Sequence, residues 1–124
     1  MKTRHAVVVL APEDTPEGRG RILHAFHTAQ ELAALGHETN VFFAGVGVTC
    51  LTAFEARDNQ FTRHYGELFD EIHPLIAGAC DFCARKRFDA AGASVAHGVD
   101  FVGGAGQHHS LAPLLLEDVT VSTF

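Results

Sequence analysis

The sequence lacks the long apolar run that a membrane-spanning helix needs. Its longest such run, Val41 to Val48, is far short of about 20 residues. The sequence also lacks a large basic cluster, because nine Lys and Arg stand against fifteen Asp and Glu, and only Arg85, Lys86 and Arg87 are adjacent. A net charge of −6 argues against binding to a phosphate backbone. We therefore expect neither a membrane nor a nucleic acid as a partner.

Cysteine is scarce and odd in number, with three residues at positions 50, 80 and 83. A secreted domain held by disulfides usually carries a denser and even set. Lys2 and Arg4 precede a short Val-rich run, as in a signal peptide, but the polar segment 12–14 follows in place of a small-residue cleavage site. We expect a cytoplasmic protein that keeps its own N-terminus and has free thiols.

The length and the apolar content indicate one folded unit. A chain of 124 residues is long enough for one core and too short for two ordinary ones. An apolar share of 47% and ten Phe argue against disorder. We expect residues 1–124 to form a single domain.

Blocks of apolar and amphipathic sequence alternate in the way typical of an α/β protein. Short Val-rich or aromatic runs predict buried strands, and apolar residues at three- and four-residue steps predict helices. The expected strands are residues 6–11, 39–44, 75–79 and 119–124, and the expected helices are residues 21–35, 49–57, 61–72, 80–91 and 110–117. Residues 94–106 fit either a loop or a short strand. The order predicts a three-layer α/β/α fold of the Rossmann or flavodoxin-like kind, with a mostly parallel sheet of four or five strands.

Residues that could form a functional site follow the predicted strands. In open α/β sheets, ligands bind outside the carboxyl ends of the strands. Gly45 and Gly47 follow the second strand, Cys80 follows the third, and His108 and His109 follow a glycine-rich stretch. A complete dinucleotide-binding glycine motif is absent. We expect Gly45, Gly47, His108 and His109 to support a site built around Cys80.

The segment Gly78-Ala-Cys-Asp-Phe-Cys-Ala84 is the most informative one. If Cys80 opens a helix, the backbone N–H groups and the helix dipole lower the pKa of its thiol. Asp81 opposes this effect by like charge, and the cations at 85–87 offset it. Cys83 lies one helical turn further, where it could resolve a disulfide, pass on a persulfide or be buried. Burial of both cysteines as small core residues is the plain alternative.

A Cys-x-x-Cys pair is also half of a zinc site. The missing ligands would come from His97, His108 or His109, although their spacings match no standard zinc finger. A thioredoxin-type motif fits less well, because Asp and Phe stand between the cysteines where Pro or Gly is usual. The leading interpretation needs no cofactor, and zinc held by Cys80, Cys83 and His97 is the alternative.

Together these features resemble the DsrE/DsrF-like family, which includes the TusD-type sulfur relay subunits. The resemblance covers most of the chain and rests on the Val-rich first strand, the strand and turn at 41–48, Cys80 at a strand end and the region 107–124. The segment 78–84 is similar to a Cys-x-x-Cys subgroup of the family. The resemblance implies a three-layer α/β fold, oligomers that are often trimers or hexamers, and a persulfide on Cys80. Cys83 and Cys50 have no counterpart in the TusD-type pattern.

Three hypotheses about function follow. In the leading one, the protein is a small sulfurtransferase or sulfur carrier in which Cys80 accepts sulfane sulfur as a persulfide and Cys83 assists its release. The second is a metal-binding or regulatory module that uses both cysteines as ligands. The third is a non-catalytic oligomeric subunit with packed cysteines. We expect a homo-oligomer, since ten Phe on short helices leave apolar surface, and a protein partner that donates or accepts sulfur.

Overall fold

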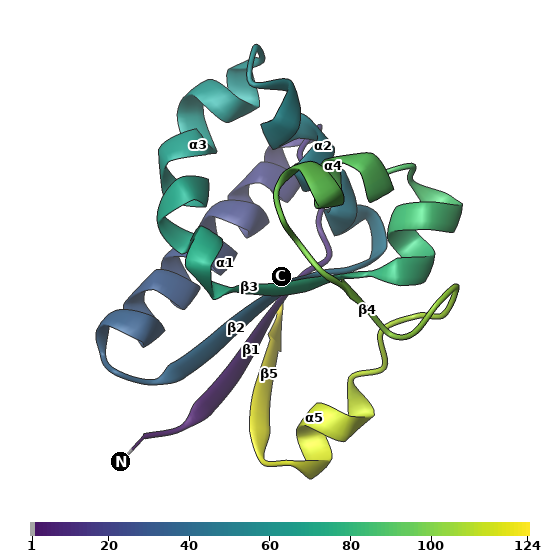
Figure 1. Cartoon of the computed structure of the whole chain (residues 1–124). Helices are drawn as coiled ribbons and strands as arrows, with labels where there is room; N and C mark the ends of the chain where they lie inside the picture. Colours follow the sequence, from purple (N-terminus) through teal and green to yellow (C-terminus); the bar gives the residue numbers. More distant parts are fainter. Residues whose placement is uncertain (1) are drawn as a thin grey trace.

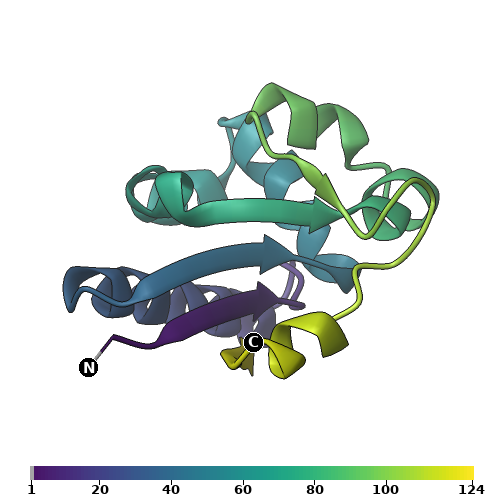
Figure 2. The same cartoon turned by 60° about the horizontal axis from the view of Figure 1, so that its bottom comes forward.

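Five parallel strands form the centre of the computed structural model, which describes residues 2–124 (Figure 1). The strands are β1 (Arg4–Val9), β2 (Glu38–Phe43), β3 (Ile76–Cys80), β4 (Phe101–Val102) and β5 (Val119–Thr123). Their order in the sheet is β4-β3-β2-β1-β5, and every pairing is parallel. The carboxyl ends of the strands therefore meet at one edge of the sheet (Figure 2). The predicted α/β fold with a parallel sheet is confirmed.

Helices cover the two faces of the sheet unequally (Figure 1). One face carries α1 (Pro16–Ala34), α2 (Thr49–Ala56), α3 (Gln60–Ile72) and α4 (Ala91–Ala96), and the other face carries α5 (Ala112–Leu116). The strand order explains this asymmetry. The connections from β1 to β4 all step in one direction across the sheet, and right-handed crossovers then place their helices on one face. The return to β5 steps the other way, so α5 lies on the opposite face.

The larger core is built on aromatic side chains. Phe26 of α1 has no exposed surface, and its ring centroid lies 6.2 Å from that of Phe43 and 6.1 Å from that of Phe54. The rings of Phe54 and Phe69 are stacked at 4.1 Å. Rings that pack in this way contribute apolar burial and favourable quadrupole contacts. Several of the ten Phe therefore stabilise the core instead of lying at the surface.

The first helix starts earlier than predicted. The Pro and Gly residues of the segment 12–20 indicate a loop, but α1 begins at Pro16. Thr15 is its N-cap, where the hydroxyl accepts a hydrogen bond from the backbone N–H of Gly18 at 3.0 Å. Proline at the first position of a helix gives up no hydrogen bond and has a suitable φ angle. The loop prediction holds for residues 12–15 and is wrong for residues 16–20, because Thr15 and Pro16 start a helix there.

The predicted helix at 80–91 is confirmed for residues 81–87 and is wrong at both ends. Cys80 is the last residue of β3, and the helical segment that follows ends in a π-helical turn, η3 (Cys83–Arg87). Asp89 then adopts a positive φ of 49°, which breaks the helix, and α4 starts at Ala91 with Gly92 inside it. Residues 94–106, which fit either a loop or a short strand by sequence, contain the end of α4 and the short edge strand β4.

Within residues 2–124, no helix combines the length and the apolar character that crossing a lipid bilayer demands.

The aromatic core gives a direct test of the fold. Phe26→Ala should lower the free energy of unfolding by about 3–5 kcal/mol, because it leaves a cavity beneath α1. Leu35→Ala is the matched control, since Leu35 is 76% exposed, and it should change stability by no more than about 0.5 kcal/mol. Urea unfolding followed by far-UV circular dichroism measures both. Equal losses in the two variants would contradict this packing.

Candidate functional site

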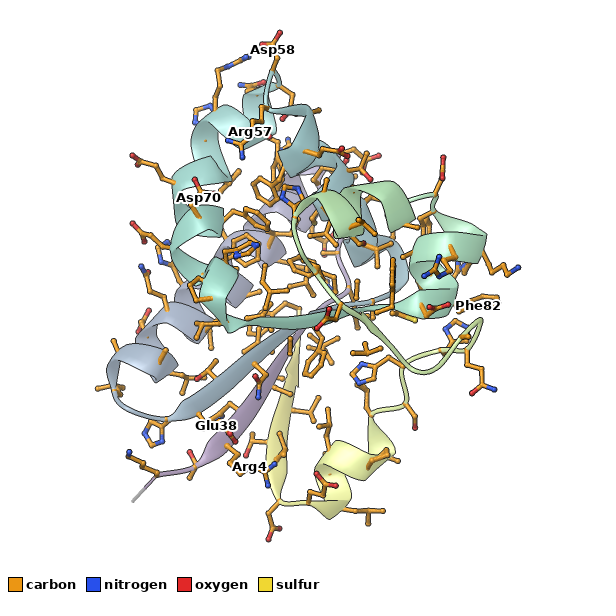
Figure 3. All side chains as sticks on the ribbon, viewed as in Figure 1. Arg4, Glu38, Arg57, Asp58, Asp70 and Phe82 are labelled. Atoms are coloured by element: carbon orange, nitrogen blue, oxygen red, sulfur yellow. The ribbon has the colours of Figure 1, made fainter. Side chains whose placement is uncertain are left out.

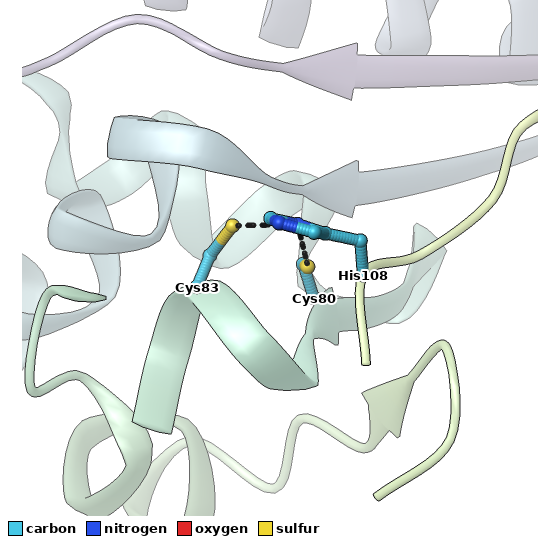
Figure 4. A group of neighbouring side chains, drawn as sticks. All are labelled: Cys80, Cys83 and His108. Atoms are coloured by element: carbon cyan, nitrogen blue, oxygen red, sulfur yellow. Dashed lines mark hydrogen bonds between the residues drawn. The ribbon is translucent and has the colours of Figure 1, made fainter. Parts of the chain in front are cut away.

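Two thiols and one imidazole converge at the carboxyl end of β3 (Figure 4). The Nδ1 atom of His108 lies 3.8 Å from the Sγ of Cys80 and 3.7 Å from the Sγ of Cys83. All three atoms lie within 4.8 Å of one another. The predicted proximity of His108 to the cysteine pair is therefore found in the structure.

The loop that follows β4 carries His108 back to the cysteines. Gly103 starts this loop with a φ of 100°, and a Cβ atom there would lie 2.6 Å from the backbone N of His109 and 2.7 Å from the carbonyl C of His108. Only glycine fits such a close approach. The backbone N–H of Phe82 donates a hydrogen bond to the carbonyl of Gln107 at 3.2 Å. The loop is thus bonded to the segment that bears the cysteines.

Asp81 fastens the same loop with a buried carboxylate. Its Oδ1 accepts the backbone N–H of Gly106 at 2.7 Å, and its Oδ2 accepts a hydrogen bond from Nε of Arg85 at 3.1 Å. The Gly106 hydrogen bond, and next the hydrogen bond and charge of Arg85, hold the pKa of Asp81 below its ordinary value. The sequence shows the i,i+4 pairing with Arg85 but not the bond to Gly106, which is 25 residues away. Sequence reasoning therefore missed this anchoring role.

The thiols are covered in the folded chain. Cys80 is 1% exposed and Cys83 is 2% exposed, whereas His108 itself is exposed above them. The prediction that Cys80 is open to solvent was wrong. Its strand-end position is at the functional edge, but the His108 loop lies over it.

The helix whose dipole is predicted to act on Cys80 is short. Residues 81–87 are helical, two of them α-helical and five in the π-helical turn, so the aligned peptide dipoles that start at Cys80 come from only about two turns. Burial raises the pKa of Cys83, the neighbouring Cys80 raises it further, and a backbone hydrogen bond from Gly45 opposes both. Cys83 is therefore a protonated thiol at neutral pH. Deprotonation of either thiol therefore depends on the hydrogen-bond donors and acceptors that lie beside its sulfur atom.

His109 contributes its backbone more than its ring. Its N–H donates a hydrogen bond to the Sγ of Cys80 at 3.3 Å. Its ring packs on Phe42, with the centroids 4.7 Å apart, and its Nδ1 is buried without a hydrogen-bond partner. Burial lowers the pKa of this imidazole, so it is neutral at neutral pH.

The other predicted site residues lie in different surroundings. Gly45 begins the 3₁₀ turn η1 (Gly45–Val48) and touches the site through its hydrogen bond to Cys83. Gly47 allows η1 to pack on the carbonyl of Val9, where a Cβ atom would clash, so its role is structural. The Nε2 of His97 lies 3.0 Å from the carbonyl oxygen of Leu51, and its ring packs on Phe69, with the centroids 5.2 Å apart. The structure thus places His108, and not His97, beside the two cysteines.

Cys50 lies outside this group. It is fully buried, and its thiol donates to the carbonyl of Ala11 at 3.7 Å. Burial, and then the charge of Glu13, raises the pKa of this thiol well above its ordinary value. Cys50 is therefore an unreactive core residue and a natural control.

A search of the sequence against models of known protein families and against curated proteins returns no match. The resemblance to the DsrE/DsrF-like family stays a prediction.

The hydrogen bonds of Asp81 predict how the loop that covers the two thiols responds to mutation. Asp81→Ala removes both acceptors, so the loop should detach more often and a small thiol reagent should label Cys80 and Cys83 about tenfold faster. Asp81→Asn keeps one acceptor and should give a smaller increase. The control is Asp58→Asn, which removes an exposed ion pair with Arg63 in the turn far from Phe82 and the site (Figure 3). Equal labelling rates in all of these proteins would contradict the anchor.

The buried imidazole predicts a pH effect on stability. Because the pKa of His109 is lowered in the folded state, the unfolded chain binds more protons as the pH falls below about 6.5. This contribution to stability is complete above that pH and is lost towards lower pH. His109→Phe, which keeps the packing on Phe42, should lose less stability between about pH 7.5 and pH 5.5 than the unmodified protein. Denaturant unfolding at several pH values measures the two slopes, and identical slopes would count against burial of the ring.

Proposed function

We propose that this protein carries sulfane sulfur as a persulfide on Cys80, with His108 and Cys83 as its assistants. The observation that supports this most directly is the placement of both thiols within 3.8 Å of one imidazole nitrogen. The site also lies at the carboxyl edge of a parallel sheet, where α/β proteins bind their ligands.

The first step is the formation of a thiolate. The Nδ1 of a neutral His108 takes the proton of Cys80, which leaves a thiolate beside an imidazolium. The backbone N–H of His109, 3.3 Å from the Sγ of Cys80, is directed at the charge that develops there. A fixed backbone donor does not need to reorient during the reaction.

The second step moves one sulfur atom without net oxidation. The Cys80 thiolate attacks the outer sulfur of a persulfide donor, the S–S bond of the donor breaks, and the donor leaves as a thiolate that takes the proton back from His108, which is then neutral again. A persulfide now stands on Cys80. A thiolate of an acceptor reverses this step by attacking the outer sulfur, and Cys80 returns to its starting form.

Cys83 offers a second route of release. Its thiolate attacks the inner sulfur of the Cys80 persulfide, a disulfide forms between the two cysteines, and hydrosulfide leaves. A dithiol reductant then restores both thiols. Because burial raises the pKa of Cys83, it acts after it has lost its proton to His108. The persulfide therefore stays on Cys80 until an acceptor thiolate attacks it or until Cys83 is deprotonated.

A donor or acceptor reaches the Cys80 sulfur only when the loop that carries His108 moves. His108 is exposed, and its loop contains three glycines with positive φ at 103, 104 and 106. Displacing an exposed side chain sacrifices little apolar burial. A donor or acceptor protein that docks on this edge would therefore open the site when it binds.

We place the protein in the cytoplasm, where a reducing pool keeps such thiols free, and we propose that it forms a homo-oligomer, a trimer or a hexamer. Apolar side chains on α5 support self-association, because Leu115 is 59% exposed and Leu116 is 86% exposed.

Loading with a sulfur donor tests the proposed function. Metal-free protein incubated with inorganic polysulfide should gain one sulfur atom on Cys80, located by mass spectrometry of its peptides. Cys80→Ser should lose the modification and Cys50→Ala should retain it. His108→Ala should slow loading by about a hundredfold at neutral pH, because it removes the proton acceptor. An unmodified Cys80, or a Cys80→Ser protein that still takes up one sulfur, would overturn the proposal.

A further inference from the structure

The group formed by Cys80, Cys83 and His108 has a second chemical capacity, which is that of a metal-ligand set. Within residues 2–124, these three side chains form a group of soft and borderline donors whose ligand atoms all lie within 4.8 Å of one another. We propose that they bind Zn²⁺ through three protein ligands.

The spacing of the donor atoms matches tetrahedral zinc. Bonds of about 2.3 Å to sulfur and about 2.0 Å to nitrogen place a sulfur and a nitrogen ligand about 3.6 Å apart. The observed separations are 3.8 Å and 3.7 Å, both measured to the same nitrogen, Nδ1 of His108 (Figure 4). The two sulfur atoms lie within 4.8 Å of each other, and tetrahedral zinc would hold them about 3.8 Å apart, so binding draws the two thiols together by up to about 1 Å. The donor set itself, two thiolates and one imidazole, is one that zinc proteins use.

Charge balance favours the ion. Cys80 and Cys83 are almost fully buried, so two thiolates without a counter-ion would be strongly unfavourable there. One Zn²⁺ replaces the two thiol protons and leaves no net charge on the group of ion and ligands. The backbone N–H of His109 adds a hydrogen bond to the Cys80 sulfur, which orients this ligand from outside.

The third ligand is held in place before any ion binds. The His108 ring packs on Phe82 with the centroids 4.3 Å apart, and the Asp81 carboxylate fixes the loop at Gly106. A preformed set of ligands loses little conformational entropy on binding. His108 is the one exposed member of the group, so it is the ligand that is free to leave the ion. Structural zinc sites have four protein ligands, so a set of three favours an exchangeable ion over a permanent one.

Metal binding and sulfur loading use the same Cys80 sulfur. A bound Zn²⁺ occupies the lone pair with which Cys80 attacks a donor, so the ion closes the site and its loss opens it. This regulatory consequence rests on the proposed function, whereas the metal site itself does not.

Metal titration tests the site without reference to sulfur transfer. Reduced protein is titrated with Zn²⁺ against a chromophoric chelator, and with Co²⁺ followed by absorption spectroscopy. We expect one equivalent per chain, a tetrahedral Co²⁺ spectrum and sulfur-to-cobalt charge-transfer bands. Cys80→Ser, Cys83→Ser and His108→Ala should each weaken binding at least tenfold. Cys50→Ala and His64→Ala, which change a core thiol and an exposed imidazole elsewhere, should bind as the unmodified protein does.

The variant at His108 keeps the test decisive if a cysteine variant fails to fold, because His108 lies on an exposed loop. The Co²⁺ spectrum of the unmodified protein also reports thiolate ligation without any mutation. Absence of binding at micromolar Zn²⁺, an octahedral Co²⁺ spectrum, or full affinity in His108→Ala would each overturn the metal site.

Sulfur loading measured with and without Zn²⁺ separates the two proposals. Loading of metal-free protein that is lost when one equivalent of Zn²⁺ is added supports the switch. Tight Zn²⁺ binding with no loading in either state would overturn the sulfur carrier and leave the metal site standing. Loading that is unaffected by bound Zn²⁺ would overturn the switch.

Discussion

The hydrogen bond from the Gly106 N–H to the buried carboxylate of Asp81 is the constraint on which the site depends. It joins the turn after β3 to the loop after β4, and the hydrogen bond from the Phe82 N–H to the Gln107 carbonyl reinforces it. Arg85 satisfies the second oxygen of the same carboxylate, so the charge is neutralised as well as bonded. Without this anchor, the glycine-rich loop would hold His108 near the two thiols less firmly, and the thiols would lose their nearest proton acceptor for part of the time.

The cover over Cys80 and Cys83 has a physical consequence for their chemistry. Burial favours the neutral thiol, as the raised pKa of Cys83 shows, and one exposed imidazole is positioned to take the proton. The state of the site depends on where the thiol protons go. Transfer of one proton to His108 leaves a nucleophilic thiolate beside an imidazolium. Replacement of both protons by a divalent ion leaves a group that has no net charge and no free nucleophile. The proposed carrier and metal functions are two outcomes of one arrangement of atoms.

The sequence predicts the parts of this arrangement that depend on local periodicity. Continuous apolar runs identify β1 and β2, and the placement of Cys80 at the end of the third strand follows from the run before it. The break after η3 was missed, because it depends on the positive φ of Asp89 and not on a proline. The sequence predicts His108 as a supporting residue beside Cys80 but names His97 as the third zinc ligand, and the structure places His108 in that position. Contacts across 25 or more residues depend on tertiary packing, which periodicity does not report.

Strand order explains why the return loop crosses this site and no other. Val102 of β4 pairs with Cys80 of β3, so the chain leaves the sheet at Gly103 directly beside the first thiol. β5 lies at the far edge next to β1, and the chain must therefore cross the carboxyl ends of the intervening strands before α5. Gly103 turns the chain tightly enough for His108 to pack back over the cysteines. A sheet with β5 beside β4 would need no such crossing, and the topology is therefore as much a part of the site as its three ligand atoms.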